Sequence, residues 1–447
     1  MTKTLILPAE IYSREFDARL LHGIIALTRG WRVIVGSKAL INRAIWRLPR
    51  GLYLCQTMTH KRRTMLRLLR SLGFVCVGWD EEGLIYLDRD VYLMRRVSLD
   101  SLKHLNSIVT WGKQGADDVG FRSRAAGIEP LPLGNPRFDL VRRDLHKLYA
   151  AEVEAIKAKH GHFVLINTNF SSFNPIISTH DLKPRKTSSK HPPSEAELAR
   201  FAKVLAHRKD VYERFIADLP AFARANPDLR FVLRAHPGEN EDIWRRAFDG
   251  LSNVAVSREG SSVPWLIAAD ALVHNSCTTA VEAAILGLTP ICFCPVESLD
   301  DESALPNPVS HRVYDFTEMQ DAIERSAAGT LPMGPEQIEV LTRHVSAIDG
   351  DLASTAIMKH FDEIDLSAMK PNHLERGAIR LYALARHAYK SMRKDYITDR
   401  YLAKVFPPIT ETDVKRRAND ISDALGIGMA IEVKTISSNI FELVPAR

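Results

Sequence analysis

Two short polar segments, each placed at the end of an apolar run, carry residues of this sequence that are well suited to chemistry. The first is Arg234-Ala235-His236-Pro237, which follows the apolar run 231–233. The second is Asn275-Ser276-Cys277-Thr278-Thr279, which follows the apolar run 271–273 and precedes an alanine-rich stretch. A strand that stops at small hydroxyl residues and turns into a helix directs free backbone N–H groups and hydroxyls at one point. The spacing therefore predicts a phosphate site.

The first segment has a functional and a structural interpretation. An imidazole at His236, at the carboxyl end of a strand, is able to stabilise a phosphate leaving group with help from Arg234. The same histidine also suits an ordinary loop in which Pro237 forms the turn. Because the Ser/Thr segment follows in the expected order, we predict that Arg234, His236 and Pro237 contact a nucleotide and that His236 takes part in catalysis.

The second segment also has a functional and a structural interpretation. Helices commonly begin with Ser or Thr for structural reasons alone, so Ser276, Thr278 and Thr279 are either helix caps or phosphate contacts. Glu282 stands three residues after Thr279 and either completes a capping box or meets a ribose hydroxyl. We predict nucleotide contacts for these four residues and for Asn275.

A cluster of carboxylates, Asp80-Glu81-Glu82-Gly83, directly follows the apolar run 74–78. Three adjacent carboxylates repel one another, and a carboxylate with a raised pKa at a strand end is able to act as a general base. Acidic residues before glycine are also ordinary turn residues. The location favours catalysis, and the sequence does not decide among Asp80, Glu81 and Glu82.

Two more polar turns follow predicted strands, and they supply Asn135, Arg137, Asn167 and Asn169 as expected cleft-lining residues. The sequence contains no Walker-type phosphate loop, no HExxH and no GxSxG. A kinase, a zinc protease and a serine esterase of the usual kind therefore have no support. We expect neither a bound metal nor a cofactor beyond the donor substrate.

Strands and helices alternate along the chain, as in α/β proteins with a doubly wound, mostly parallel sheet. Before residue 150, the expected strands are 4–8, 32–36, 52–55, 74–78, 107–110 and 131–134, and the expected helices are 15–29, 41–48 and 61–72. Beyond it, the expected strands are 162–166, 230–233, 254–256, 271–273 and 291–293, and the expected helices are 195–226, 240–248 and 279–286. This pattern predicts Rossmann-like domains over 1–155 and 156–345, which face each other across a cleft, and a helical C-terminal extension over 346–447.

The composition is that of a soluble globular protein. With 447 residues the chain is too long for one ordinary core, and 45% hydrophobic with 26% charged residues excludes a disordered or collagen-like chain. The net charge of +6 is mild, because 54 acidic residues stand against 60 basic ones. No nucleic-acid-binding pattern accompanies the basic clusters 60–63, 183–190 and 376–400, so nucleic acid is the least supported partner.

Cysteine usage and hydropathy predict the compartment. The five cysteines mostly lie in apolar runs, and Cys292-Phe293-Cys294 lacks the spacing of a zinc or redox pair, so a reducing compartment fits best. The chain shows neither a charged leader with an apolar core nor a window of about 18–20 apolar residues that would span a bilayer. We expect a cytoplasmic protein. The basic helical segment 376–400 either packs on the first domain or rests on anionic lipid of the inner membrane.

Taken together, these features resemble bacterial surface-carbohydrate biosynthesis proteins with a GT-B glycosyltransferase-like architecture, in which two Rossmann-like domains surround a nucleotide-sugar cleft. The resemblance covers roughly residues 1 to 365. The segments that carry it are 15–19, 80–83, 111–112, 134–139, 167–170, 236–237 and 275–279.

The order of an acidic-acidic-Gly motif, a His-Pro motif and a Ser/Thr motif is also similar to that of bacterial sialyltransferases and Kdo transferases, which use CMP-activated sugars. In those families an acidic residue acts as the base, and the other two motifs hold CMP. The resemblance therefore implies that Glu81 or Glu82 is the base. The extra carboxylate at Asp80 departs from the pattern and leaves that choice open. A weaker resemblance is to teichoic-acid glycerophosphotransferases, which also use CMP-linked donors.

We therefore predict a metal-independent glycosyltransferase that moves a sugar, such as Kdo or another nonulosonic acid, from a CMP-sugar to a bacterial surface polysaccharide acceptor. Capsular polysaccharide and lipopolysaccharide, built on lipid-linked intermediates, are acceptors of this kind. The alternatives are a non-catalytic GT-B-like protein that binds a nucleotide or a glycan, and a CDP-polyol phosphotransferase of the teichoic-acid type. The carboxylates at 80–82 favour an enzyme, because a pure binding protein needs no base.

Overall fold

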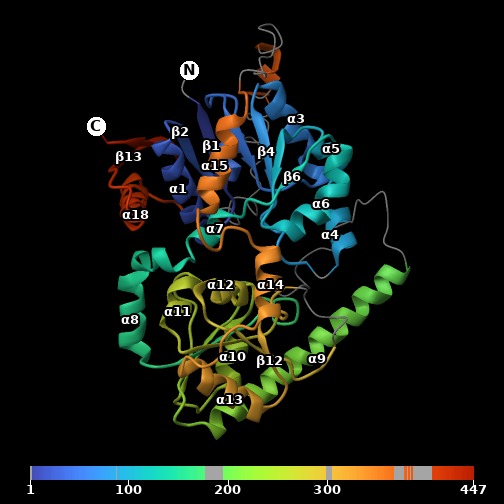
Figure 1. Cartoon of the computed structure of the whole chain (residues 1–447), viewed down its shortest axis with the longest axis vertical. Helices are drawn as coiled ribbons and strands as arrows, with labels where there is room; N and C mark the ends of the chain where they lie inside the picture. Colours follow the sequence, from blue (N-terminus) through green and yellow to red (C-terminus); the bar gives the residue numbers. More distant parts are fainter. Residues whose placement is uncertain are drawn as a thin grey trace. The chain divides into compact units, whose positions relative to one another are not determined.

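The computed structural model describes residues 3–86, 88–176, 195–298, 305–366 and 405–446, together with isolated residues between 377 and 385. These residues form two compact units, one made of Met1–Leu148 and Thr342–Arg447 and the other of Tyr149–Leu341 (Figure 1). Each unit is built on its own mostly parallel sheet. The predicted fold class, α/β with two Rossmann-like doubly wound domains, is confirmed.

The first unit contains an eight-stranded sheet in the order β13-β14-β2-β1-β3-β4-β5-β6. Its strands are β1 (Thr4–Ala9), β2 (Arg32–Ser37), β3 (Leu52–Cys55), β4 (Val75–Trp79), β5 (Ser107–Val109), β6 (Pro130–Leu131), β13 (Ile431–Ser437) and β14 (Ile440–Pro445). From β1 to β6 all pairs are parallel, whereas β14 is antiparallel to both β2 and β13. Every residue of β1, β3, β4 and β5 is buried, as expected where helices cover both faces of a parallel sheet.

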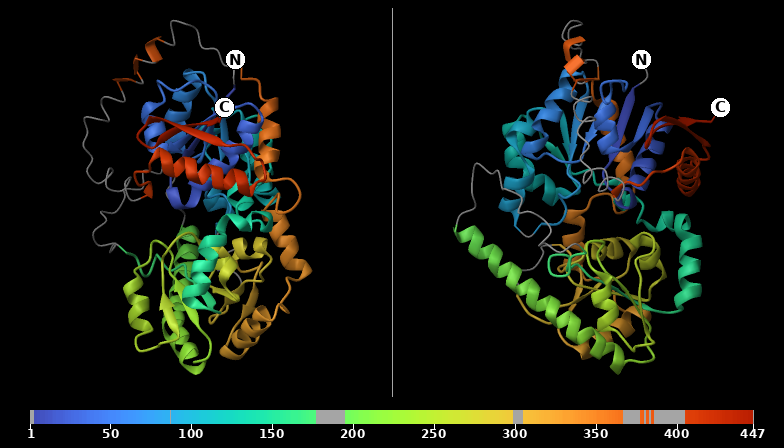
Figure 2. Two further views of the ribbon diagram at one scale, coloured as in Figure 1. Left: turned by 90° about the vertical axis from the view of Figure 1, so that its left-hand side faces the viewer. Right: turned by 180° about the vertical axis from the view of Figure 1, so that it is seen from behind.

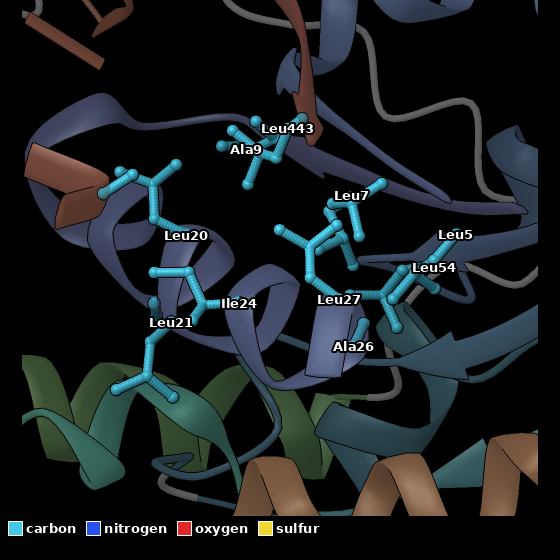
Figure 3. Packing of buried hydrophobic residues seen from close by; sticks show 14 of the residues in the cluster. Leu5, Leu7, Ala9, Leu20, Leu21, Ile24, Ala26, Leu27, Leu54 and Leu443 are labelled. Atoms are coloured by element: carbon cyan, nitrogen blue, oxygen red, sulfur yellow. The ribbon is translucent and has the colours of Figure 1, made fainter. Parts of the chain in front are cut away.

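Helix α1 forms the centre of the first core. The helices of this unit are α1 (Tyr12–Thr28), α2 (Lys38–Ala44), α3 (Arg63–Ser71), α4 (Arg89–Arg96), α5 (Leu99–Leu102), α6 (Lys113–Ala125), α7 (Pro136–Asp139), α15 (Ala353–Glu363) and α18 (Glu411–Ala424). α1 packs against the sheet and also against α7, α15 and α18, so it is buried almost all round. Figure 3 shows Leu27 of α1 beside Leu7 and Leu54 of the sheet, with Leu20, Leu21 and Ile24 further along the helix. Gly23 permits this approach, because a Cβ there would lie 2.9 Å from Val33 Cγ1.

The C-terminal part of the chain belongs to the first unit, so the prediction of a separate helical extension over 346–447 is wrong. α18 packs on α1, and β14 joins the sheet beside β2 (Figures 1 and 2). Leu443 of β14 is buried in the first core, and Glu442 accepts two hydrogen bonds from Arg32 at 2.7 and 2.9 Å. These partners lie some four hundred residues apart, which local pattern analysis does not detect. The segment 386–400 lies outside the described residues.

The second unit contains a six-stranded, fully parallel sheet in the order β12-β11-β10-β7-β8-β9. Its strands are β7 (Val164–Asn167), β8 (Phe231–Arg234), β9 (Val254–Val256), β10 (Ala271–His274), β11 (Ile291–Phe293) and β12 (His311–Val313). Its helices are α8 (Ala150–His160), α9 (Glu195–Ala225), α10 (Glu241–Ala247), α11 (Ser262–Ala268), α12 (Thr279–Leu286), α13 (Phe316–Ala327) and α14 (Pro335–His344), the last of which crosses the unit boundary. The chain builds outward from β7 to β9 and then returns to place β10 on the other side of β7, which is the Rossmann order.

Most elements lie where the sequence predicts them. All the strands expected before residue 300 are present, with ends that differ by at most three residues. Helix α2 begins three residues earlier and ends four residues earlier than the predicted 41–48. The elements that local patterns missed include β12, β13 and β14, which are edge strands or pair with distant ones.

Burial of His22 in α1 makes the stability of the first unit depend on pH. The ring is fully buried against Trp79 and Phe361, and within the described residues neither ring nitrogen has a hydrogen-bond partner. Burial, with a smaller contribution from Arg19, lowers the pKa of His22 to about 3. An unfolded histidine binds a proton near pH 6.5, so between about pH 6.5 and 3 the unfolded chain holds more protons than the folded one.

We therefore expect His22→Leu to reduce acid destabilisation. In the native protein, His22 should cost about 1.4 kcal/mol of unfolding free energy for each pH unit below 6.5, down to the folded pKa. The measurement is urea unfolding at pH 7.0, 6.0 and 5.0. His162→Leu is the control, because that side chain is 97% exposed. Equal pH slopes for native protein and His22→Leu would show that His22 is not held neutral.

Candidate functional site

The order in which strands are added to the second sheet reverses between β7 and β10, and several predicted site residues follow these strands. In the register, Asn167 at the end of β7 is opposite both His274 of β10 and Arg234 of β8. The loops after β7, β8 and β10 therefore leave the same edge of the sheet. In open α/β sheets, ligands bind outside the carboxyl ends of the strands at this switch point.

Direct hydrogen bonds join the loop after β7 to the loop after β10. Asn275 Oδ1 accepts the backbone N–H of Asn169 at 2.9 Å, and Asn169 Nδ2 donates to the carbonyl of Ser276 at 3.3 Å. Asn167 Nδ2 donates to Thr279 Oγ1 at 2.9 Å. Within the described residues, the buried Asn167 Oδ1 has no hydrogen-bond partner. The structure thus brings together residues that were separate candidates in the sequence, and it leaves a buried acceptor beside them.

The start of α12 provides donors at the same place. The N–H of Thr278 has no hydrogen-bond acceptor in the described part of the chain, as is usual at the start of a helix, whereas the N–H of Thr279 donates to the Cys277 thiol. Ser276, just before this turn, has φ of +47°, a left-handed conformation that is costly for a residue other than glycine. The Thr278 N–H and the positive end of the helix dipole suit an anion.

Glu282 does not complete the predicted capping box. The N-terminus of α12 has no side-chain cap among the described residues, and Glu282 Oε2 instead accepts a hydrogen bond from the Ser262 hydroxyl at 2.7 Å. Ser262 begins α11, so Glu282 links α12 to α11. The capping interpretation was wrong because the tertiary partner replaced the local one.

A fully buried carboxylate, Glu239, fixes the loop that contains His236 and Pro237. It accepts hydrogen bonds from the Thr168 hydroxyl, the N–H groups of Phe170 and His236, and the indole N–H of Trp244, at 2.8 to 3.2 Å. Sequence patterns contain no signal for this role beyond a glutamate three residues after the histidine. Glu239 therefore holds the loops after β7 and β8 in one arrangement.

His236 itself is exposed, and one of its ring nitrogens is already engaged. Nδ1 accepts the N–H of Gly238 at 3.0 Å, so the neutral ring carries its proton on Nε2. A proton held on Nε2 is suited to donation to an anionic oxygen. The geometry of this loop is compatible with the predicted role of His236.

Arg234 does not point toward the predicted phosphate site but has structural partners. Its guanidinium donates to the carbonyls of Glu259 and Gly260 at 2.6 and 3.1 Å and lies over the Trp265 ring, 4.7 Å from its centroid. Burial lowers the pKa of Arg234 to about 10, which leaves it cationic at neutral pH. Arg234 therefore holds the loop that follows β9, which is a structural task that the sequence interpretation did not include.

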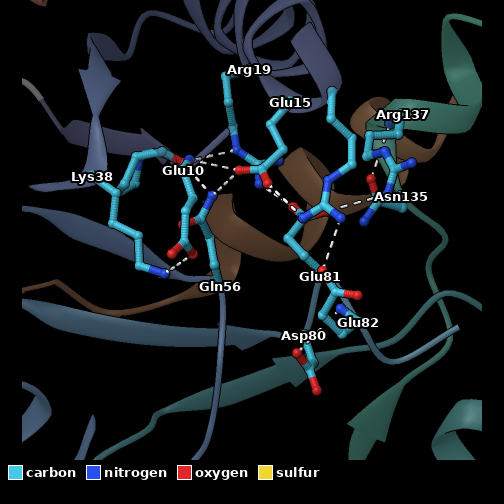
Figure 4. Close-up of polar contacts among 12 residues, drawn as sticks. Glu10, Glu15, Arg19, Lys38, Gln56, Asp80, Glu81, Glu82, Asn135 and Arg137 are labelled. Atoms are coloured by element: carbon cyan, nitrogen blue, oxygen red, sulfur yellow. Dashed lines mark hydrogen bonds and ion pairs between the residues drawn. The ribbon is translucent and has the colours of Figure 1, made fainter. Parts of the chain in front are cut away.

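The first unit has its own polar cluster, drawn in Figure 4, at the end of β1 and the start of α1. Glu15 is fully buried and accepts hydrogen bonds from the Glu10 N–H at 2.8 Å and from Gln56 Nε2 at 2.5 Å. Arg19, also fully buried, donates to the Pro8 carbonyl at 3.1 Å and forms an ion pair with Glu81. Buried charges persist in proteins when they are paired in this way.

The three adjacent carboxylates do not face one another, contrary to the expectation of mutual repulsion. Asp80 is buried, pairs with Arg96 and accepts a hydrogen bond from the Tyr92 hydroxyl at 3.1 Å. Glu81 is buried beside Arg19. Glu82 lies 2.9 Å from Arg14 Nη1, and its side chain is 52% exposed. Each carboxylate thus has its own arginine, and Glu82 is the one open to solvent.

Asn135 and Arg137, predicted to line a cleft, lie beside this cluster. Asn135 caps α7 by accepting the Arg137 N–H at 3.0 Å, and Arg137 Nη1 is 3.8 Å from Glu81 Oε2 (Figure 4). Asn135 therefore has a local structural role, while Arg137 adds positive charge next to Glu81.

The residues that the structure describes contain neither a metal-binding cluster nor a membrane-spanning helix. No three His, Cys, Asp or Glu side chains in this part of the chain come together to hold a metal ion. No helix in the same residues combines the length and hydropathy needed to cross a membrane.

Comparison with known proteins gives only distant similarity. No family model and no curated protein matches the sequence. Among solved structures, wall teichoic acid polymerase TagF, as a variant soaked with CDPG, aligns at TM-score 0.45 and 12% identity over 81% of this chain and 88% of TagF. The UDP-GlcNAc 2-epimerase of Methanocaldococcus jannaschii aligns at TM-score 0.46 and 13% identity, over 81% of this chain and 99% of the epimerase. S. aureus MnaA with UDP aligns at TM-score 0.43 and 11% identity, over 81% of this chain and 96% of MnaA.

We expect the carboxylates at 80 and 82 to differ in their effect on stability. Asp80→Asn leaves Arg96 without its buried partner and should lower the unfolding free energy by about 2–4 kcal/mol. Glu82→Gln removes an exposed pair and should change it by less than about 1 kcal/mol. Urea unfolding of both variants at pH 7 measures the difference. Equal losses in the two variants would contradict the assignment of Asp80 as the structural member.

Proposed function

We propose that this protein is a transferase that uses a nucleotide-activated donor, with the donor phosphate bound at the β7/β10 switch point of the second unit. The observation that carries the proposal is the first turn of α12 beside Asn167 and Asn169. Within the described residues, the Thr278 N–H without an acceptor, the positive end of the α12 dipole and the Ser276 and Thr279 hydroxyls meet there, at the edge where Rossmann-like sheets bind ligands. The unpartnered Asn167 Oδ1 would accept a hydrogen bond from a hydroxyl of the ligand.

The proposed chemistry is transfer of a glycosyl group. The bond between the sugar carbon and the phosphate oxygen breaks, and an acceptor hydroxyl oxygen forms the new bond to that carbon. The phosphate leaves with added negative charge, which the Thr278 N–H, the positive end of the α12 dipole and the His236 imidazole would meet. No metal is needed in this scheme, because these groups supply the stabilisation.

A carboxylate has to accept the proton of the acceptor hydroxyl. Asp80 is committed to Arg96 and Tyr92, and Glu81 to Arg19, whereas Glu82 is half exposed and pairs with Arg14 at the surface. We therefore assign the base to Glu82 first and to Glu81 second.

The identity of the nucleotide rests on the motif resemblance alone. A cytidine nucleotide is the prediction, and a CMP-sugar, including one that carries Kdo or another nonulosonic acid, is the predicted donor. A bacterial surface polysaccharide is the predicted acceptor. A CDP-polyol donor of the teichoic-acid type would fit the same phosphate site.

The pairing of all three carboxylates with arginines favours one alternative. A protein that binds a nucleotide or a glycan without turning it over would also keep these residues neutralised. The alternative predicts nucleotide binding at the switch point together with no transfer activity, so binding and turnover have to be measured separately.

Nucleotide binding is tested by a thermal-shift series with CMP, CDP, UMP, UDP and GDP. We expect CMP or CDP, at 100 times its dissociation constant, to stabilise the second unit by about 2.7 kcal/mol. Ser276→Ala and Thr279→Ala should weaken that effect, while Thr330→Ala, which removes a hydroxyl bonded to the Arg325 carbonyl, should not. Stabilisation by none of the five nucleotides would reject the proposal.

Turnover tests the base. With a sugar donor built on the nucleotide that binds best, Glu82→Gln should lower kcat by about 10²-fold or more and leave nucleotide affinity unchanged. Glu259→Gln is the matched control, because that carboxylate is 70% exposed and pairs with Lys159. Undiminished kcat in Glu82→Gln would transfer the role to Glu81, and undiminished kcat in Glu81→Gln as well would exclude both glutamates as the base.

A further inference from the structure

The turn 275–277, which precedes the proposed phosphate site, is held from a segment that carries no recognisable sequence motif. That segment is the turn 305–310, which lies directly before β12. Its anchors, Leu305 and Val309, are almost fully buried, and the Ser310 N–H donates to the Asn307 carbonyl at 3.0 Å. We call it the 305–310 turn. Asn307 and Ser310 are themselves 3% and 5% exposed.

One contact runs from Ser276 to Asn307. The Ser276 hydroxyl donates to Asn307 Oδ1 at 2.8 Å. Ser276 is also the residue with φ of +47°. A strained backbone conformation of this kind persists only where surrounding contacts hold it, and on its other side Ser276 offers its carbonyl to Asn169 Nδ2. Asn307 and Asn169 thus hold the strained residue from two directions.

A second contact runs through His274, the last residue of β10. Its Nε2 is 2.8 Å from Ser310 Oγ, and its Nδ1 accepts the N–H of Cys277 at 3.4 Å. The Ser310 hydroxyl gives its own proton to the Pro306 carbonyl. Ser310 Oγ is therefore the acceptor and His274 Nε2 the donor, which leaves Nδ1 free to accept from Cys277.

The direction of this chain of hydrogen bonds requires a neutral imidazole. A doubly protonated ring would point an N–H at the N–H of Cys277, where two donors would oppose each other. The environment agrees, since His274 is fully buried and burial lowers its pKa to about 3. The chain from Cys277 through His274 and Ser310 to Pro306 is thus complete and has one direction.

We infer that Asn307 and Ser310 are positioning residues that set the turn 275–277, and with it the Thr278 N–H at the start of α12, for the phosphate of a nucleotide. This inference rests on the proposed function for the identity of the ligand, but not for the existence of the two contacts. According to this inference, the 305–310 turn controls the affinity for phosphate, although it lies outside the Ser/Thr motif 275–279.

The contacts are tested first without a ligand. Amide hydrogen exchange is measured over residues 274–280 in Asn307→Ala and Ser310→Ala. Loss of either contact should speed exchange in this segment by about tenfold, with no change in the central strand β7. Ser326→Ala is the matched control, because it also removes one serine hydroxyl that donates to a carbonyl, that of Asp270. Unchanged exchange in both alanine variants would overturn the inference.

The effect on the ligand is tested with CMP by calorimetry. Asn307→Ala and Ser310→Ala should each weaken CMP binding by about fivefold to tenfold. Asn307→Asp keeps an oxygen acceptor for the Ser276 hydroxyl, so slow exchange should return. CMP binding should nevertheless stay weak at low salt and recover at high salt, because the new charge repels the phosphate. Slow exchange without any recovery of CMP affinity at high salt would contradict the positioning role.

The outcomes of these experiments separate the inference from the proposed function. Faster exchange with unchanged CMP affinity would overturn the positioning role. If the native protein binds none of the five nucleotides, the proposed function fails, and the exchange experiment alone then decides whether the 305–310 turn holds residues 275–277.

Discussion

The parallel pairing of β7 with β10 is the constraint on which the candidate site depends. These strands are separated by about a hundred residues, yet they are neighbours in the sheet because the chain first builds β8 and β9 on one side of β7 and then returns. That return opens the edge at which Asn167, Asn169 and the start of α12 meet. A hydrogen-bonding ladder between two short apolar strands therefore determines where a polar site can exist.

Buried charge makes this arrangement specific. Glu239, without solvent contact, joins the loops after β7 and β8 through donors from four residues. In the first unit, Glu15 and Arg19 do the same between α1 and the ends of the strands. A buried ionised group without partners is very costly, so each of these residues permits only the loop geometry that satisfies it. The polar clusters thus select one conformation for segments that the apolar core alone would leave free.

The carboxylates at 80–82 show how tertiary partners change the meaning of a motif. As a sequence, three adjacent acids indicate repulsion and a raised pKa. In the structure, they pair with Arg96, Arg19 and Arg14 respectively, so that they differ in burial and in partner. Tertiary partners also change the interpretation of Arg234, because its guanidinium donates to two backbone carbonyls and lies over an aromatic ring. Residue type indicates what chemistry is available, whereas the partner decides whether it is used for structure.

The sequence by itself determined the alternation of strands and helices, the two Rossmann-like units and the position of most strands, because apolar runs and glycine-terminated helices are local signals. It also identified Asn167, Asn169 and 275–279 as polar strand ends. Only the tertiary structure decided that these ends meet, that Glu282 turns to Ser262, that β14 completes the first sheet, and that Asn307 and Ser310 reach the turn 275–277. The reason is physical: each of these contacts joins residues between 20 and several hundred positions apart, and their energy depends on burial and geometry that no local window contains.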